Sequence, residues 1–151
     1  MSISLTVLGQ DVTTDSARYY IPPANQKMLE FTEAHMGQQI GGGICAEFVT
    51  AAVNHATGVN TWRNTRRVDT RVEWIKPGDV LYMSWKRGRR SHVAVIIEVK
   101  EPHIVKVAHQ NFNRMKYVVE TTYDLNQKIR EGRKVKIYRP KASEEPNASN
   151  Q

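Results

Sequence analysis

The spacing of apolar residues changes halfway along the chain. In the first half it follows helical periodicity, and a first helix is predicted to open at Pro22–Pro23 and to end near Gly37. Its apolar face carries Met28, Leu29, Thr32 and Met36. A second helix follows a run of three glycines and is predicted to end near Gly58. Its buried stripe is formed by Cys45, Phe48, Val49, Ala52, Val53 and Ala56.

The second half carries short, strand-like apolar runs separated by turns. Turn signals occur at residues 76–79, where a Pro-Gly-Asp sequence follows a lysine, and at Glu101–Pro102. The predicted strands are 80–85, 92–99, 104–109, 117–122 and 135–138. Consecutive strands at this spacing indicate an antiparallel sheet of about five to six strands. Helices followed by strands predict an α+β fold in which the cysteine helix packs on the sheet.

Size and charge are typical of a globular protein with a basic surface. The chain has 151 residues, 40% of them apolar, and a net charge of +7. We expect one domain over residues 1–140 and a disordered tail over residues 141–151, which lack large apolar side chains. Two arginine-rich segments, 63–67 and 86–90, are expected in loops. The positive charge favours an anionic partner such as a cell-wall polymer, a nucleic acid or a lipid surface.

The N-terminal sequence carries no recognisable targeting signal. Its first nine residues lack the basic start of a signal peptide, and no apolar run of the chain is long enough to cross a bilayer. We therefore expect no transmembrane segment. The chain is expected to be cytosolic, to be delivered by a route that needs no such signal, or to be given without its leader.

Cys45, the only cysteine, lies at the joint between Gly41–Gly43 and the second helix. A helix N-terminus favours the thiolate form of a cysteine, and its free N–H groups stabilise an oxyanion formed beside the sulfur. The plainer interpretation of a lone cysteine is a small buried side chain. The preceding glycines, which let the backbone turn tightly and a substrate approach closely, favour a nucleophile.

His92 heads an apolar strand and is the candidate base that takes the thiol proton. On the strand at 104–109, alternation places His109 and Asn111 on one face, so either side chain is a candidate to orient His92. Gln110 points to the other face and is the weaker candidate for that role. The alternative is that these are polar residues at a strand end without a catalytic role.

Weaker candidates flank these residues. Gln38 and Gln39 precede the glycines, and a side-chain amide from either is suited to binding an oxyanion. Tyr20 is a candidate for the wall of the cleft. Three arginines close to His92 are expected to steer an anionic substrate: Arg87, Arg89 and Arg90.

We expect neither a metal nor a cofactor. A zinc site built from Cys45, His92 and His109 is conceivable, because three ligands and a water make a catalytic site. The sequence contains no short ligand pair such as Cys-x-x-Cys or His-x-x-x-His to support it.

The order of these motifs resembles the CHAP and NlpC-like cell-wall peptidases, which are papain-like. The resemblance covers residues 38–111: the glycines before Cys45, then Trp74-Ile-Lys-Pro-Gly-Asp-Val80, then Ser91-His-Val-Ala-Val-Ile96 and Val107-Ala-His-Gln-Asn111. It implies a papain-like fold with Cys45 as nucleophile, His92 as base and His109 as the third polar residue. CHAP sequences usually carry an acidic residue at the position of His109, whereas NlpC-like sequences commonly use histidine there.

The resemblance also implies a function. Its members hydrolyse amide bonds in peptidoglycan, either within the stem peptide or between sugar and peptide, and act as lysins, wall-remodelling enzymes or injected antibacterial toxins. It implies peptidoglycan as the partner, action at the cell wall or periplasm, and an inhibitor or immunity protein where the chain is injected. Two alternatives stay open: a papain-like acyltransferase or hydrolase of lipid or protein substrates, and a non-enzymatic basic module that binds nucleic acid. The aromatic residues do not alternate with basic ones, which disfavours the last.

Overall fold

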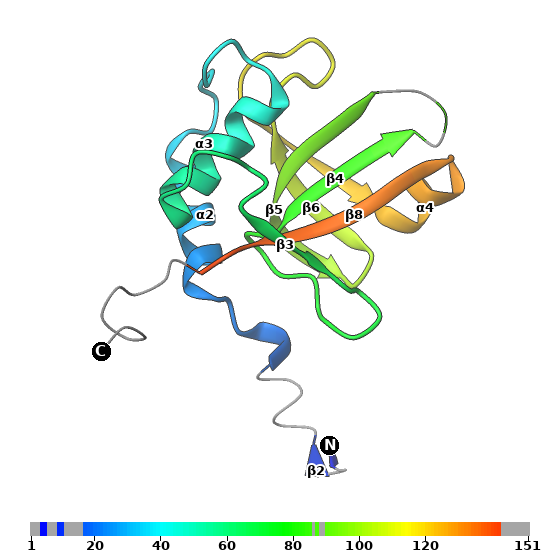
Figure 1. The fold of residues 1–151 in the computed structure, drawn as a ribbon. Helices are drawn as coiled ribbons and strands as arrows, with labels where there is room; N and C mark the ends of the chain where they lie inside the picture. The colour runs from blue at the N-terminus through cyan, green and yellow to red at the C-terminus, as the bar shows by residue number, and fades with distance from the viewer. Residues whose placement is uncertain (1–3, 6–8, 11–16, 86, 88–89, 143–151) are drawn as a thin grey trace, which may run out of the picture.

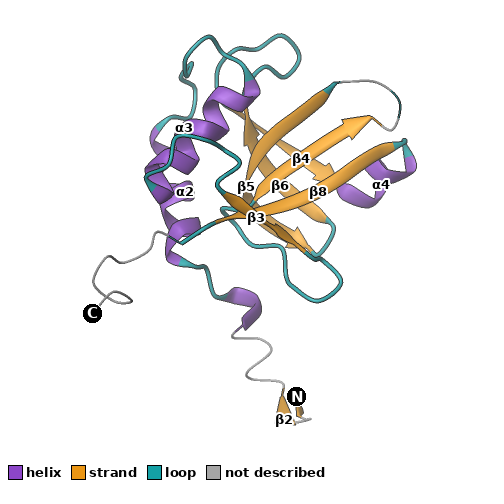
Figure 2. Ribbon diagram, in the orientation of Figure 1, coloured by secondary structure: helices purple, strands orange, loops and turns teal. Residues whose placement is uncertain are grey.

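A computed structural model describes residues 4–5, 9–10, 17–85, 87 and 90–142. Two short strands, β1 (Ser4–Leu5) and β2 (Gly9–Gln10), pair with each other near the N-terminus. Two long helices precede a six-stranded antiparallel sheet, and a short helix follows late in the chain (Figures 1 and 2). This arrangement confirms the predicted α+β fold. No helix among the described residues is both long and apolar enough to cross a membrane.

The two long helices lie side by side on one face of the sheet (Figure 1). Helix α2 (Pro23–Ala34) begins at a proline, which suits the first turn because its missing N–H has no partner there anyway. Helix α3 (Cys45–Thr57) ends at Gly58, whose φ of +80° gives the left-handed cap expected of a glycine. Both predicted helices are confirmed, and the predicted stripe of α3 from Phe48 to Ala56 is buried.

The large sheet has the order β3-β8-β4-β5-β6-β7, and every neighbouring pair is antiparallel. Its strands are β3 (Thr65–Val68), β4 (Val80–Trp85), β5 (Ser91–Glu101), β6 (Ile104–His109), β7 (Val119–Asp124) and β8 (Arg133–Pro140). The predicted strands all occur, and two of them have the predicted bounds. Strand β8 lies between β3 and β4, so the strand that comes last among the described residues is inside the sheet and not at its edge.

Two elements differ from the sequence prediction. The segment 63–67 was expected in a loop, but Thr65–Val68 forms the edge strand β3 because its backbone pairs with β8. Helix α4 (Leu125–Arg130) was not predicted; its N-cap is Asp124, whose carboxylate accepts a hydrogen bond from the Gln127 N–H. Residues 143–151, most of the expected tail, lie outside the described residues.

The sheet separates two hydrophobic clusters. The first lies between the sheet and helices α2 and α3, and it includes Met28, Phe48, Val93 and Val95. The second covers the opposite face, towards α4, and includes Met83, Ala94, Ile96 and Val107. Because successive strand residues face opposite ways, the buried residues of β5 from Val93 to Ile96 alternate between the two clusters. This alternation decides where the candidate catalytic side chains point.

Candidate active site

Cys45 is the first residue of α3, directly after the glycine-rich loop. Its side chain is half-buried at the edge of the first cluster. Gly43, two residues earlier, has a φ of +87°, and a Cβ there would lie 2.6 Å from Lys116 Cβ in the loop after β6. The glycine therefore permits both the backbone turn and the close approach of the two loops that flank Cys45.

Glu47 caps the turn that precedes Cys45. Its carboxylate accepts hydrogen bonds from the N–H groups of Gly42 at 3.0 Å and Ile44 at 3.1 Å. These two backbone hydrogen bonds lower the pKa of Glu47. The Gly42 and Ile44 donors are thereby occupied. The hydrogen bonds of the described residues leave the N–H groups of Cys45 and Ala46 without a protein acceptor, so these are the candidate oxyanion donors.

Gln110 ties the cysteine loop to the sheet. It is fully buried, and its side-chain amide donates to the carbonyl oxygens of Ile44 at 2.9 Å and Ile40 at 3.2 Å. Its carbonyl oxygen accepts from the Ile40 N–H. As alternation predicts, Gln110 faces away from His92. A side chain next to His109 in sequence therefore fixes the backbone next to Cys45.

His92, His109 and Thr121 form a hydrogen-bonded row across β5, β6 and β7. His92 Nε2 lies 2.9 Å from His109 Nδ1, and His109 Nε2 lies 2.9 Å from Thr121 Oγ1. Phe112 stacks on the His109 ring with centroids 4.5 Å apart, which shields His109 from water. The structure thus brings together two histidines that are 17 positions apart in sequence.

Both histidines are neutral at pH 7. Burial, and secondarily the charge of Arg133, lowers the pKa of His92 to about 4. Burial, and secondarily the neighbouring His92, lowers the pKa of His109 to about 3. A neutral imidazole is the form that accepts a proton.

The histidine pair and α3 belong to opposite faces of the sheet. His92 shares its side of β5 with Ala94 and Ile96, whereas α3 packs on the side of Val93 and Val95. Among the described residues, Cys45 Sγ makes no hydrogen bond to a histidine. The Cys45 end of α3, the start of β5 and the loop after β6 nevertheless lie at the same end of the molecule (Figure 1).

A cavity of about 340 Å³ opens beside His92. It is lined by Trp85 from β4, Tyr123 from β7 and Arg133 from β8, together with Asn111 and Phe112. Asn111 has a φ of +60°, a left-handed conformation that asparagine tolerates better than most residues. This turn ends β6 at His109 and places Asn111 at the cavity; of the two predicted orienting residues, His109 is the one that contacts His92.

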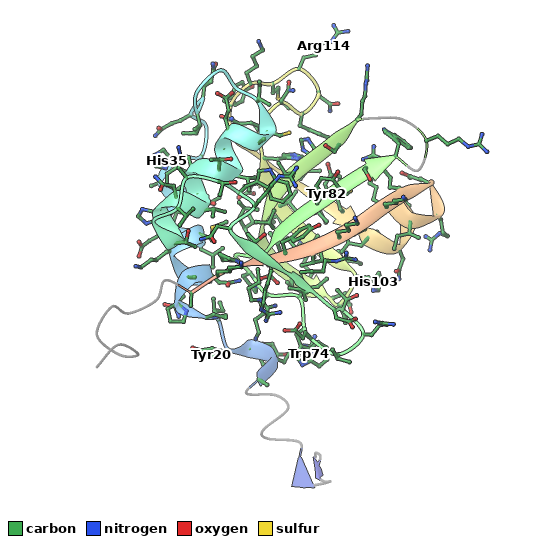
Figure 3. All side chains as sticks on the ribbon, viewed as in Figure 1. Tyr20, His35, Trp74, Tyr82, His103 and Arg114 are labelled. Carbon is green, nitrogen blue, oxygen red and sulfur yellow. The ribbon has the colours of Figure 1, made fainter. Side chains whose placement is uncertain are left out.

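The remaining predicted residues lie elsewhere. The exposed amide of Gln38 donates to Ala34 O at the end of α2, and that of Gln39 donates to Gly41 O in its own loop. Tyr20 is at the far end of the molecule from Arg114, which belongs to the loop after β6 (Figure 3). The Lys76 ammonium group binds the Tyr20 carbonyl oxygen and holds it there. The structure therefore does not bring Tyr20 to the active site.

The predicted steering arginines are only partly described. Arg87 and Arg90 are exposed, and Arg90 lines the cavity beside His92. Arg89 lies outside the described residues. Within the described part of the chain, no group of three or more His, Cys, Asp or Glu side chains is placed to hold a metal ion.

The comparisons with known proteins identify the family. The CHAP domain model matches residues 35–111, just over half of the chain, from the end of α2 to the turn after β6. The chain belongs to the CHAP domain family. The matched region contains Cys45, His92 and His109. No curated protein matches the chain.

Two solved structures share the CHAP fold of this chain. One is the crystal structure of Ly7917, with a TM-score of 0.59 and 14% identity. The other is Ly7917 with the hydrolysing product of MDP, with a TM-score of 0.58 and 13% identity. Each match covers 77% of this chain and 62% of the other, so the chain spans less than two thirds of the length of those proteins.

Sequence reasoning missed three residues around the histidine pair: Phe112, Thr121 and Arg133. Phe112 follows a predicted strand end, and only the left-handed turn at Asn111 folds it back over His109. Thr121 and Arg133 come from strands whose order in the sheet the sequence does not reveal. Thr121 lies on β7 in the same alternation as the buried Tyr123, a signal that becomes useful once β6 and β7 are known to pair.

Proposed function

We propose that this CHAP domain is a cysteine hydrolase that cleaves an amide bond in peptidoglycan, with Cys45 as nucleophile, His92 as base and His109 as the residue that orients His92. The observation that carries the proposal is the His92–His109–Thr121 row at the same end of the molecule as the helix start that bears the only cysteine. Family membership and the fold shared with a protein crystallised with a hydrolysis product of MDP support the substrate class.

The proton positions in the row follow from the role of His92 as base. If His109 Nε2–H donates to Thr121 Oγ1, then His109 Nδ1 is left as an acceptor and receives the Nε2–H of His92. His92 Nδ1 then carries a lone pair. None of the hydrogen bonds among the described residues uses that atom. It is the atom that we propose takes the Cys45 proton.

The lowered pKa of His92 favours proton transfer during attack over a permanent ion pair. Cys45 attacks the amide carbonyl as His92 removes its proton, and the N–H groups of Cys45 and Ala46 bind the oxyanion. Protonated His92 gives its proton to the leaving amine, which leaves an acyl-enzyme. His92 then activates the water that hydrolyses it.

The bond and the setting belong to the same proposal. The bond is an amide of the stem peptide or the amide that joins sugar to peptide. The enzyme acts on the cell wall as a lysin or as an injected antibacterial effector, and an injected effector is expected to have a matching inhibitor.

The test is digestion of purified peptidoglycan by the wild type, Cys45→Ala and His92→Gln, with products identified by mass spectrometry. We expect the wild type to release defined fragments. In both variants we expect the rate of digestion to fall by about 10³-fold or more, as is usual when a catalytic residue is removed. His55→Gln, which changes an exposed histidine on α3, is the matched control and keeps full activity. Intact wall with reduced wild type, or full activity of Cys45→Ala, would refute the proposal.

A further inference from the structure

Arg133 begins β8 and projects into the cavity beside His92. Its guanidinium stacks over Trp85 on the paired strand β4, with the central carbon 4.0 Å from the ring centroid. The Arg133 side chain lines the same cavity as His92, and its charge is one cause of the lowered His92 pKa. The stacking fixes the guanidinium plane through an aromatic surface and leaves its N–H edge for another partner.

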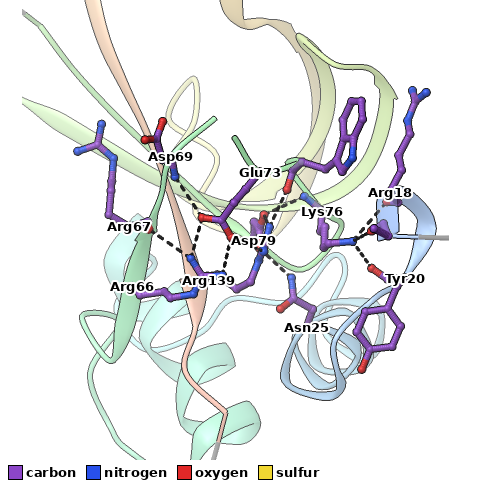
Figure 4. A network of polar contacts seen from close by, with 12 residues as sticks. Arg18, Tyr20, Asn25, Arg66, Arg67, Asp69, Glu73, Lys76, Asp79 and Arg139 are labelled. Carbon is purple, nitrogen blue, oxygen red and sulfur yellow. Dashed lines mark hydrogen bonds and ion pairs between the residues drawn. The ribbon is translucent and has the colours of Figure 1, made fainter. Parts of the chain in front are cut away.

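This guanidinium has no acidic partner among the described residues. Its Nε is buried and makes no hydrogen bond. Arg139, at the other end of β8, shows what a satisfied arginine looks like in this fold (Figure 4). Arg139 donates to both oxygens of Asp79 at 2.9 Å and to the Trp74 carbonyl oxygen at 2.7 Å. The two terminal Nη groups of Arg133 also make no hydrogen bond among the described residues, but unlike Nε they are not buried. They are therefore the donors that a ligand in the cavity is able to reach.

The cavity has the chemistry of an anion site. No acidic residue lines it within the described part of the chain, and two arginines, Arg90 and Arg133, do. A cavity of about 340 Å³ has room for one amino-acid residue of a substrate beside these arginines.

We propose that Arg133 binds a carboxylate of the peptide substrate, in a subsite formed with Trp85 and Tyr123 next to His92. The proposal rests on the proposed function for the peptide nature of the substrate. One planar guanidinium, held flat by Trp85, matches the two oxygens of a carboxylate in bidentate geometry. A phosphate is normally held by several donors from a glycine-rich backbone or a helix N-terminus, and neither lines this cavity.

Binding without turnover tests the subsite. The probes are the synthetic tetrapeptide L-Ala-D-Glu-L-Lys-D-Ala with free carboxylates and the same peptide with its carboxylates amidated. Calorimetry measures both affinities in the full chain carrying Cys45→Ala. We expect the acid form to bind about tenfold or more tightly than the amide form, as a charge-assisted bidentate pair implies.

Three variants on β8 assign the effect. Arg133→Gln is expected to bind both peptides equally. Arg133→Lys is expected to keep part of the preference for the acid peptide, because lysine retains the charge but lacks the planar pair of N–H donors. Lys134→Gln removes the same charge from the next, exposed position and keeps the full preference. Thermal unfolding of each variant checks its fold, and Arg133→Lys carries the test if the glutamine variant does not fold.

Each other outcome overturns the proposal. The subsite is refuted by equal affinity for the two peptides, by no binding of the acid form, or by a preference that survives in Arg133→Gln. Stronger competition by inorganic phosphate than by acetate removes its assignment to carboxylate. The binding result does not depend on catalysis. If the wild type fails to cut peptidoglycan while the preference for the acid peptide persists, the proposed function is refuted and the carboxylate subsite is still supported.

Discussion

The position of one proton decides what each histidine of the pair is able to do. His109 has two nitrogens and two neighbours, His92 and Thr121, at the same distance of 2.9 Å. If the Thr121 hydroxyl donates to His109, the proton of His109 lies on Nδ1 and points at His92. His92 Nε2 then accepts that proton in a hydrogen bond, so the one proton of neutral His92 lies on its Nδ1. In this tautomer His92 Nδ1 has no lone pair with which to accept the thiol proton. His92 is therefore able to act as the proposed base only when Thr121 accepts from His109, and this role needs no contact with the cysteine.

Thr121→Val tests this positioning role. The change keeps the shape of the side chain but removes the acceptor, so both tautomers of His109 become accessible. We expect kcat for peptidoglycan hydrolysis to fall by about tenfold, with KM unchanged, because general base catalysis depends on the correct tautomer. Thr121→Ser restores the hydroxyl and is expected to restore kcat. An equal loss in the serine variant would point to packing in place of proton position.

At the scale of elements, the cysteine is placed by two loops that meet. The loop 37–44 before α3 and the loop 110–118 after β6 contact each other at Gly43 and Lys116, and Gln110 joins them by buried hydrogen bonds. The start of α3 is thus fixed to the end of the strand that carries His109. This explains how a thiol on a helix and a histidine on a strand keep a constant relation.

Replacing Gly43 by alanine tests the junction, with Gly58 at the other end of α3 as a matched control. Both glycines have a positive φ, +80° at Gly58 and +87° at Gly43, so both alanine variants lose about 1 kcal/mol of stability from backbone strain. A Cβ at Gly58 meets open space, whereas at Gly43 it would clash with Lys116 Cβ and approach Lys116 O at 3.0 Å. We expect Gly43→Ala alone to separate the loops and reduce hydrolysis, measured with chemical unfolding and wall digestion. Similar losses in both variants would argue against the junction.

At the scale of the molecule, the sequence predicted what local periodicity encodes. The stripe of α3 and the strand around His92 follow from spacing, and the face shared by His109 with Val105 and Val107 follows from alternation. The edge strand at 65–68 was missed because its two exposed arginines are typical of a loop. The segment becomes a strand through its backbone pairing with β8. Arg133 comes next to His92 through a sheet order that places the last strand beside β4. That order depends on long-range packing, which no short window of sequence contains.

The stability of the whole molecule is expected to depend on the histidine pair in mildly acidic solution. Both pKa values in the folded state, about 4 for His92 and about 3 for His109, lie below the ordinary value near 6.5. Between those limits the unfolded chain binds more protons than the folded one, so the free energy of unfolding falls as the pH falls.

Urea unfolding at pH 7.5, 6.5, 5.5 and 4.5 measures this dependence. From pH 6.5 to 4.5 we expect a loss of roughly 2 kcal/mol for each histidine, since carboxylates titrate mostly below that window. The double variant His92→Gln, His109→Gln has no protons to take up at these positions, so its curve is expected to be flatter whatever its absolute stability. A double variant with the wild-type slope would mean that the two imidazoles bind protons as readily folded as unfolded, and the assignment of His92 as a neutral base would fail with it.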